Sequence, residues 1–270
     1  MNSVKVNDAP MKKPSPAKKA KAAARLAITE HRTRLTLIFS LMICGAAMIL
    51  VFIASTSFTY AFAVMTGEAA PDAVYNLIDT ISILPVFFIT APLCLGFYRM
   101  AVRAAYGESI GISETFRYFS SFTLAAKSWL VGIIAAFPVF FAVAAYYFAS
   151  FIPDGGASKL VRYALIPAAV LLLCVPNVLS MPTSYAFVCS DDANPLKCFT
   201  ASVKASSGNF WRIVALRLGF LPLMLLSFCT IGVLFLIYTI PYMTVAEIYF
   251  SEYLLTGDFK KLTTEDKIHE

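Results

Sequence analysis

The sequence predicts an all-α protein: a polytopic membrane helix bundle with about six spanning helices and two short amphipathic surface helices on the cytoplasmic side. Three observations predict this class. Hydrophobic residues make up 59% of the 270 residues, and the mean hydropathy is +0.73. Charged residues make up only 14%, against about 25% in ordinary soluble domains. Several apolar runs also reach about 18 residues or more, the length at which a helix crosses a bilayer.

The chain divides into three predicted parts. Residues 1–34 hold nine Lys and Arg against two acids, a net charge of +7. Because this segment is also rich in Ala and Pro, we expect a basic, largely disordered cytoplasmic tail that orients the first helix. An arm that binds lipid headgroups or nucleic acid is the alternative. Residues 35–255 form the predicted transmembrane helical domain, and residues 256–270 form a cytoplasmic C-terminal tail.

Five apolar runs supply the predicted spanning helices. They are 35–65, 80–98, 129–152, 163–189 and 210–255. As a single helix, the last run would measure about 70 Å against a hydrocarbon core of about 30 Å. We therefore expect it to break at a tight outer turn near Gly232 into two spans, 212–229 and 231–249.

The distribution of positive charge predicts the orientation of the chain. With six spans and a cytoplasmic N-terminus, 19 of the 22 Lys and Arg residues belong to the cytoplasmic side, as the positive-inside rule requires. With five spans this number is 16, so the orientation holds in both cases and six spans fit better. The predicted outer loop 66–79 contains three acids and no base. We therefore expect both termini to be cytoplasmic.

The segment 194–208 has the features of a short helix lying on the inner membrane surface. Asn194 can cap it, Pro195 suits its first turn and Gly208 can end it. Its apolar and basic side chains fall on different faces, as an interfacial helix requires. The apolar residues are Leu196, Phe199 and Val203, and the basic residues are Lys197 and Lys204.

A similar helix is predicted within 111–132. Ser113 can cap it, and Phe116 and Phe119 form an apolar stripe. Each predicted surface helix is followed by a tryptophan beside a basic residue, at the entrance to the next span. Trp prefers the headgroup layer, so we predict a set of membrane-interface anchors. These are Trp129, Lys197, Lys204, Trp211 and Arg212.

Polar residues inside the apolar runs define two further candidate sites. The fourth run contains Pro176 and Pro182 and a polar cluster, which either packs by interhelical hydrogen bonds or lines a solute or headgroup cavity. The residues of this cluster are Asn177, Ser180, Thr183, Ser184 and Tyr185. We also predict an intramembrane ion pair between Arg217 and Glu247, which the six-span arrangement places in adjacent helices.

The sequence shows no catalytic or metal-binding pattern. Its six cysteines include no CxxC, and both histidines lie outside the spans, so we expect no metal, no cofactor and no disulfide framework. No Ser–His or paired-carboxylate arrangement is visible, so an enzyme such as a lipid-modifying one is the least favoured class. We expect a non-enzymatic scaffold or accessory protein that interacts with other membrane proteins, or with anionic lipid through the N-terminal tail and surface helices. A transporter or channel using the fourth run is the alternative, and no nucleic acid is expected as a partner.

A motif in the C-terminal half combines a serine, a glycine six residues later, a basic and aromatic entrance, and a span that ends in a glycine turn and Pro-Tyr. Its residues are Ser202, Gly208, Asn209, Trp211, Arg212, Leu216, Leu218, Phe220, Gly232, Pro241 and Tyr242. With the segment 95–122, it resembles a family of bacterial integral membrane proteins known as the domain of unknown function 975. The resemblance covers 85–255 and departs at Glu247, which interrupts the final helix. It implies a multi-pass bundle in a bacterial plasma membrane and implies no reaction.

Overall fold

The computed structural model describes residues 15–29, 31–66, 72–150, 178–190, 194–230 and 232–258. Within these ranges every regular element is a helix, which confirms the all-α class. Three helices are long and apolar enough to cross a membrane: Thr33–Ala61, Pro85–Ala105 and Phe210–Ser227. A fourth results if Ile112–Phe119 and Phe122–Phe137, bent by 95° against each other, are one broken span. The described residues therefore supply three or four candidate spans, and the count of six stays a prediction.

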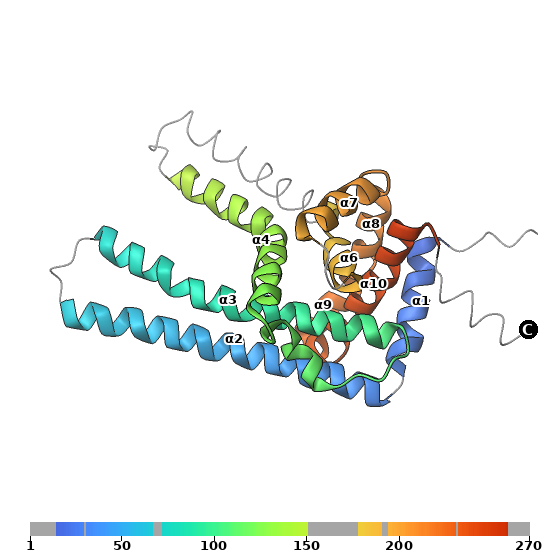
Figure 1. Cartoon of the computed structure of the whole chain (residues 1–270), viewed down its shortest axis with the longest axis horizontal. Coiled ribbons are helices and arrows are strands. Elements are labelled where there is room, and N and C mark those ends of the chain that lie inside the picture. Colours follow the sequence, from blue (N-terminus) through green and yellow to red (C-terminus); the bar gives the residue numbers. More distant parts are fainter. Residues whose placement is uncertain are drawn as a thin grey trace, which may run out of the picture.

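Two long antiparallel helices, α2 (His31–Thr66) and α3 (Asp72–Ala105), form the extended hairpin in Figure 1. The far half of α2 exposes large apolar side chains, including Phe52, Phe58 and Met65, the last of which is 85% exposed. A helix that is apolar all round belongs in lipid or in a core, and these side chains have no core around them. The near half of α2 packs instead, and its Ser40 hydroxyl is hydrogen-bonded to that of Thr115 at 2.7 Å.

After α3, a turn at Gly107 leads into the short 3-10 helix η2 (Ile112–Phe119) and then into α4 (Phe122–Ser150). The predicted cap at Ser113 is wrong, because Gly111 occupies the N-cap position and no side chain caps the helix. The predicted apolar stripe exists, but it faces outward, with Phe116 and Phe119 both exposed.

The face of η2 that is buried against the protein carries Thr115 and Tyr118, which are 0% and 3% exposed. Gly96 of α3 permits this contact, because a Cβ at that position would collide with the Thr115 carbonyl. An outward apolar face is what lipid stabilises at a membrane protein's surface, so the stripe's direction suits a helix at the membrane interface.

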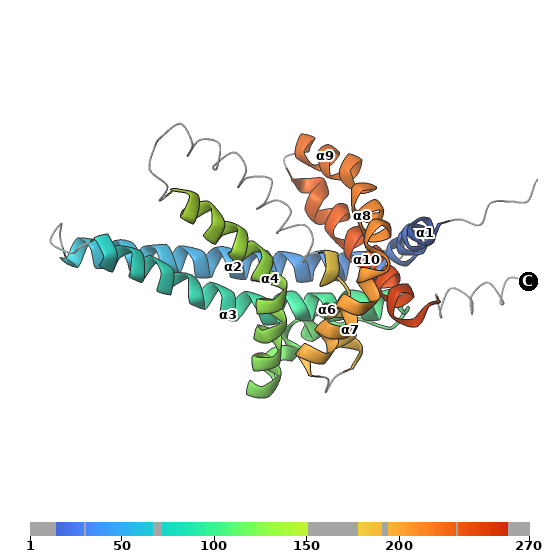
Figure 2. The same cartoon turned by 90° about the horizontal axis from the view of Figure 1, so that it is seen from above.

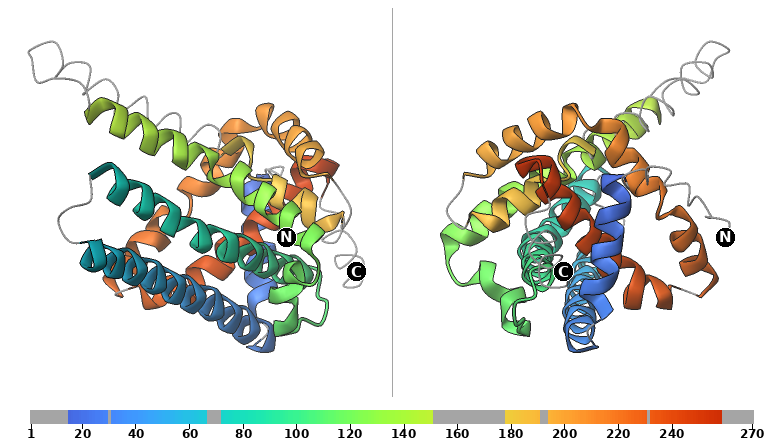
Figure 3. Two further views of the ribbon diagram at one scale, coloured as in Figure 1. Left: turned by 60° about the vertical axis from the view of Figure 1, so that its left-hand side comes forward. Right: turned by 90° about the vertical axis from the view of Figure 1, so that its right-hand side faces the viewer.

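The C-terminal third is a series of shorter helices gathered around the end of α3 (Figure 2). In chain order they are α6 (Thr183–Cys189), α7 (Pro195–Ser207), α8 (Phe210–Leu218), α9 (Leu221–Cys229), the π-helical turn η3 (Phe235–Thr239) and α10 (Ile240–Thr256). Viewed along α2 and α3, helices α7 to α10 run across that hairpin (Figure 3).

The predicted turn in the last apolar run is present. Gly232 has φ +78°, a left-handed conformation that glycine adopts without strain, and its N–H donates to the Ser227 carbonyl at 3.0 Å. On the two sides of the turn, the Ser227 and Thr239 hydroxyls are hydrogen-bonded at 2.8 Å and buried. The run 210–255 is therefore a helical hairpin, as its length required.

Helix α10 is the most enclosed element of the C-terminal third. Val245, Ala246, Ile248 and Phe250 are fully buried, and Glu252 is 4% exposed. The helix packs against α1, α3, α6 and α7. Because two acidic residues on a lipid-facing helix would be costly, burial inside the protein is the favourable place for a helix that carries Glu247 and Glu252.

Part of the predicted N-terminal tail is helical, while residues 1–14 lie outside the described residues. Pro16–Thr29 form helix α1, which packs across α10 and α8 (Figure 1). Its inner face is made of small side chains and one Ile, and comprises Ala20, Ala23, Ala24 and Ile28. The Lys21 ammonium lies 4.1 Å from the centre of the Phe220 ring, so α1 contacts the break between α8 and α9.

Candidate functional site

The ends of α3, α6 and α10 meet η2 around an open cleft of about 650 Å³. Volumes of about 300–1,000 Å³ are usual for ligand sites. Three arginines and three glutamates line it, so the cleft is rich in charge and has no formal net charge. They are Arg99, Arg103, Arg117, Glu108, Glu114 and Glu252. Arg99 and Arg103 lie one turn apart at the end of the candidate span Pro85–Ala105, so both lie on the same face of α3.

A chain of ion pairs holds the arginines of α3 in place. Arg99 Nε lies 3.2 Å from Glu114 Oε2, and Arg103 Nη1 lies 2.6 Å from Glu114 Oε1. Arg103 Nε also donates to Glu108 Oε2 at 2.9 Å. Glu114 is 20% exposed, so its two arginine contacts are partly shielded from water and stronger than a surface pair. This network joins η2 to α3.

Two tyrosines and Glu252 form the floor of the cleft. The hydroxyls of Tyr106 and Tyr185 are hydrogen-bonded to each other, and Tyr106 also interacts with the Glu252 carboxylate. Burial raises the pKa of Tyr106 well above its usual value, so the phenol stays protonated and available as a donor. Close by, the Tyr249 hydroxyl donates to the Ala105 carbonyl at 2.5 Å and caps the end of α3.

The predicted polar cluster of the fourth run is distributed over several environments. Tyr185 reaches the cleft floor, and Thr183 is 3% exposed with no hydrogen-bond partner among the described residues. Ser180 lies in the turn that precedes α6, and Pro182 is the N-cap of that helix. Asn177 lies outside the described residues. The cluster is therefore not gathered into one polar cavity in the described part of the chain.

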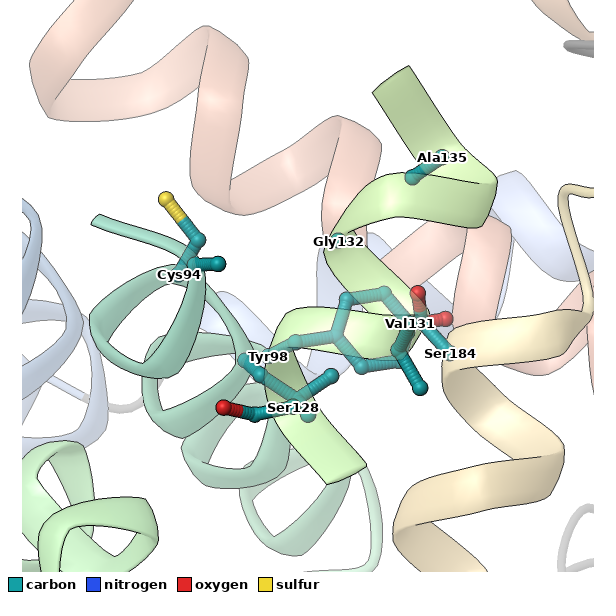
Figure 4. A pocket seen from close by; sticks show the side chains of 9 residues that line it. Cys94, Tyr98, Ser128, Val131, Gly132, Ala135 and Ser184 are labelled. Atoms are coloured by element: carbon teal, nitrogen blue, oxygen red, sulfur yellow. The ribbon is translucent and has the colours of Figure 1, made fainter. Parts of the chain in front are cut away.

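Ser184 of this cluster faces a second, small pocket of about 200 Å³ between α3, α4 and α6. Figure 4 shows Tyr98 reaching from α3 past α4, with Ser184 beyond it. Gly132 lies on the α4 wall, where a Cβ would approach Ala91 to 2.8 Å. This close approach agrees with the small-residue packing typical of membrane helices.

Arg217 and Glu247, predicted to pair, are brought together by the hairpin. Arg217 Nε lies 3.3 Å from Glu247 Oε1, joining α8 to α10, and the two side chains are 31% and 23% exposed. Whether this pair lies inside the membrane stays a prediction.

The predicted interface anchors differ in how far they are exposed. Trp211 is 79% exposed at the start of α8, and Lys197 and Lys204 project outward from α7. Arg212 donates to Asn209 Oδ1 at 2.9 Å and to the Tyr253 hydroxyl at 3.5 Å. Trp129 is half-buried, and its Nε1–H donates to the Phe88 carbonyl at 2.8 Å.

Helix α7 begins and ends where the sequence predicts. The Asn194 side chain accepts a hydrogen bond from the Leu196 N–H at 3.0 Å, Pro195 follows, and Gly208 is the C-cap. Its buried face consists of Pro195, Cys198, Ser202 and Ser206. Leu196 is 54% exposed, whereas Phe199 and Val203 are half-buried, so the predicted apolar stripe is exposed in part.

One cysteine, Cys189, lines the cleft. Cys44, Cys94, Cys189, Cys198 and Cys229 are free thiols, while Cys174 lies outside the described residues. Burial raises the pKa of Cys198, which makes its thiol less reactive. Among the described residues, no group of three or more His, Cys, Asp or Glu side chains is placed to hold a metal ion.

Sequence reasoning counted Arg99, Arg103 and Arg117 as inner positive charges but did not bring them together with Glu108 and Glu114. The local signal was available: Glu108 follows Arg103 by five residues, and Glu114 opens η2. Glu252 had no local signal, because it reaches the cleft from the other end of the chain.

Comparison with known proteins gives no assignment. No family model matches the chain, no curated protein matches it, and no solved structure matches its fold. The resemblance to the domain of unknown function 975 therefore gains no support from these comparisons.

Proposed function

We propose that this chain is a non-enzymatic membrane scaffold or accessory protein. It binds anionic lipid, and through this lipid other membrane proteins, with the end of the bundle that carries α1. One observation carries the proposal: α1, a basic helix, is docked across the end of the bundle by its alanine face and leaves its charges outward. Lys18, Lys19 and Arg25 are all exposed on α1. Exposed Lys and Arg near an anionic leaflet each contribute about 1 kcal/mol to membrane attraction.

Helix α7 adds to the same surface chemistry. It exposes Lys197 and Lys204 together with Leu196, the combination of basic and apolar groups that an interfacial helix uses. The transport alternative has less support. The hydroxyl of Tyr185 is used by Tyr106, and Ser184 faces a pocket of only about 200 Å³.

The test uses the full chain in nanodiscs with and without anionic lipid. We expect anionic lipid to protect α1 from trypsin and to raise the thermal midpoint, and we expect added salt to remove both effects. A double variant, Lys18→Gln with Lys19→Gln, should lose about 2 kcal/mol of this stabilisation.

Ala22→Gln is the matched control, since Ala22 is also exposed on α1 and carries no charge. Equal responses of the double variant and the control would reject the proposal. Solute uptake into proteoliposomes would replace it with the transport alternative.

A further inference from the structure

The charged cleft has two chemically distinct parts. Arg99, Arg103 and Arg117 supply guanidinium groups along α3 and η2. The floor supplies the Glu252 carboxylate and the phenols of Tyr106 and Tyr185. Guanidinium groups recognise phosphate in a bidentate manner, whereas carboxylates and tyrosines hold ammonium groups.

The balance of charge restricts the ligand. Each arginine of α3 is already paired with a glutamate, at 3.2 Å for Arg99 and 2.6 Å for Arg103, both to Glu114. A simple anion or a simple cation would add an unbalanced charge to a cleft whose three arginines and three glutamates sum to zero. A zwitterion leaves the cleft neutral, because its phosphate can lie against the arginines while its ammonium lies against the Glu252 carboxylate.

The position of the cleft indicates where such a ligand comes from. Arg99 and Arg103 lie at the end of a candidate span, Glu252 lies near the end of α10, and η2 exposes Phe116 and Phe119 beside them. The cleft is therefore level with the end of a spanning helix, where phospholipid headgroups lie. Its volume of about 650 Å³ lies within the usual range for a ligand site.

We propose that this cleft binds a phosphodiester that carries a primary ammonium group, as in the ethanolamine headgroup of a phospholipid. The phosphate lies against the arginines, and the ammonium lies over the floor, where it donates hydrogen bonds to Glu252 and the tyrosine oxygens. A primary ammonium has three N–H donors for these acceptors, whereas a trimethylammonium has none, so ethanolamine binds more tightly than choline. This binding site does not depend on the proposed role of α1.

The experiment measures lipid retention by native mass spectrometry. The full chain is purified in mild detergent with equal amounts of ethanolamine, choline and glycerol phospholipids. Three variants are compared: Glu252→Gln removes the charge of the floor, Arg117→Gln removes an exposed cation of the cleft, and Ala201→Gln places the same neutral side chain on the exposed face of α7 outside the cleft. Circular dichroism checks that each variant is folded.

We expect the wild type to retain ethanolamine lipid about tenfold better than choline lipid, the effect of one charge-assisted hydrogen bond. Glu252→Gln should abolish this preference, Arg117→Gln should lower retention of both zwitterionic lipids, and Ala201→Gln should change neither. If Glu252→Gln does not fold, the exposed Arg117 variant still decides the question.

Equal retention of ethanolamine and choline lipids by the wild type would overturn the proposal. Loss of the anionic glycerol lipid in Arg117→Gln, with retention of ethanolamine lipid unchanged, would overturn it too, because the cleft would then hold an anion. Equal losses in Arg117→Gln and Ala201→Gln would also overturn it. Displacement of the bound lipid by water-soluble glycerophosphoethanolamine tests the shared chemistry. Binding of glycerophosphoethanolamine without a preference among the lipids would support the proposed phosphate and ammonium contacts. It would reject a bilayer lipid as the ligand.

Loss of anionic-lipid dependence in the α1 double variant, with ethanolamine preference intact, would separate this site from the scaffold proposal.

Discussion

Replacing Gly96 by alanine should separate η2 from α3. A Cβ at this position would collide with the backbone carbonyl of Thr115, and a backbone atom cannot rotate away as a flexible side chain can. Overpacking of this kind costs about 1–3 kcal/mol, and the gain of up to about 1 kcal/mol from alanine's helix propensity offsets only part of it. A net loss near 2 kcal/mol lowers the thermal midpoint by about 4–8 °C in a chain of this size.

The matched control is Gly45→Ala in α2. A Cβ there would meet nothing within 4 Å, so the substitution should leave the thermal midpoint unchanged or raise it. Thermal unfolding in detergent, followed by circular dichroism, measures both variants. Because the Thr115 hydroxyl is bonded to Ser40 of α2 at 2.7 Å, a displaced η2 should also become accessible to protease. A Gly96→Ala midpoint equal to or above that of Gly45→Ala would refute the contact between η2 and α3.

Three further predictions follow from other parts of the molecule. Arg217→Glu or Glu247→Arg alone should destabilise the protein by about 1–2 kcal/mol. This loss is smaller than for a fully buried pair because both side chains are partly exposed. The double exchange should recover most of the loss in thermal unfolding. A cysteine added at the C-terminus of a cysteine-free chain should resist a membrane-impermeant maleimide on intact cells, and labelling before lysis would reject six spans. Burial and the nearby Arg25 lower the pKa of Lys21. The docking of α1 should therefore become tighter as pH rises from that lowered pKa towards 10.5. Trypsin protection measures this trend, which should vanish in Lys21→Met.

Local rules of chain geometry were sufficient for part of the fold. The limits of α7 follow from Asn194, Pro195 and Gly208, and the break in the last apolar run follows from its length and from Gly232. The hairpin then brings Arg217 close to Glu247, so their contact could also be predicted. In each case, the determining residues lie close together in the sequence or on either side of one turn.

Helix α1 and the charged cleft could not be predicted, because both depend on contacts between residues that lie far apart in the sequence. The composition of Pro16–Thr29 suggested disorder, because a helix face of three alanines has little affinity of its own. It is ordered by α10, more than two hundred residues later, where the Tyr242 hydroxyl donates to the Lys21 carbonyl at 3.4 Å. The cleft has the same origin, since Glu252 and the α3 arginines meet only in the folded chain.

The faces of the short helices show that an apolar stripe predicts the buried side of a helix only when the surrounding solvent, water or lipid, is known. In water, the stripes of η2 and α7 would mark the buried side, yet Phe116 and Leu196 are exposed while Thr115 and Ser202 are fully buried. Ser202 donates to the Leu179 carbonyl at 2.9 Å, so its burial is satisfied by a hydrogen bond. Next to a bilayer, apolar side chains lose nothing by facing outward, and small or hydrogen-bonded polar side chains allow helices to approach closely. Because lipid also disfavours charged side chains, α10 with its two acids is enclosed by the protein. Charged side chains also lie on the outward face of α1, in the neutral cleft at the end of α3, and on α7 and α8.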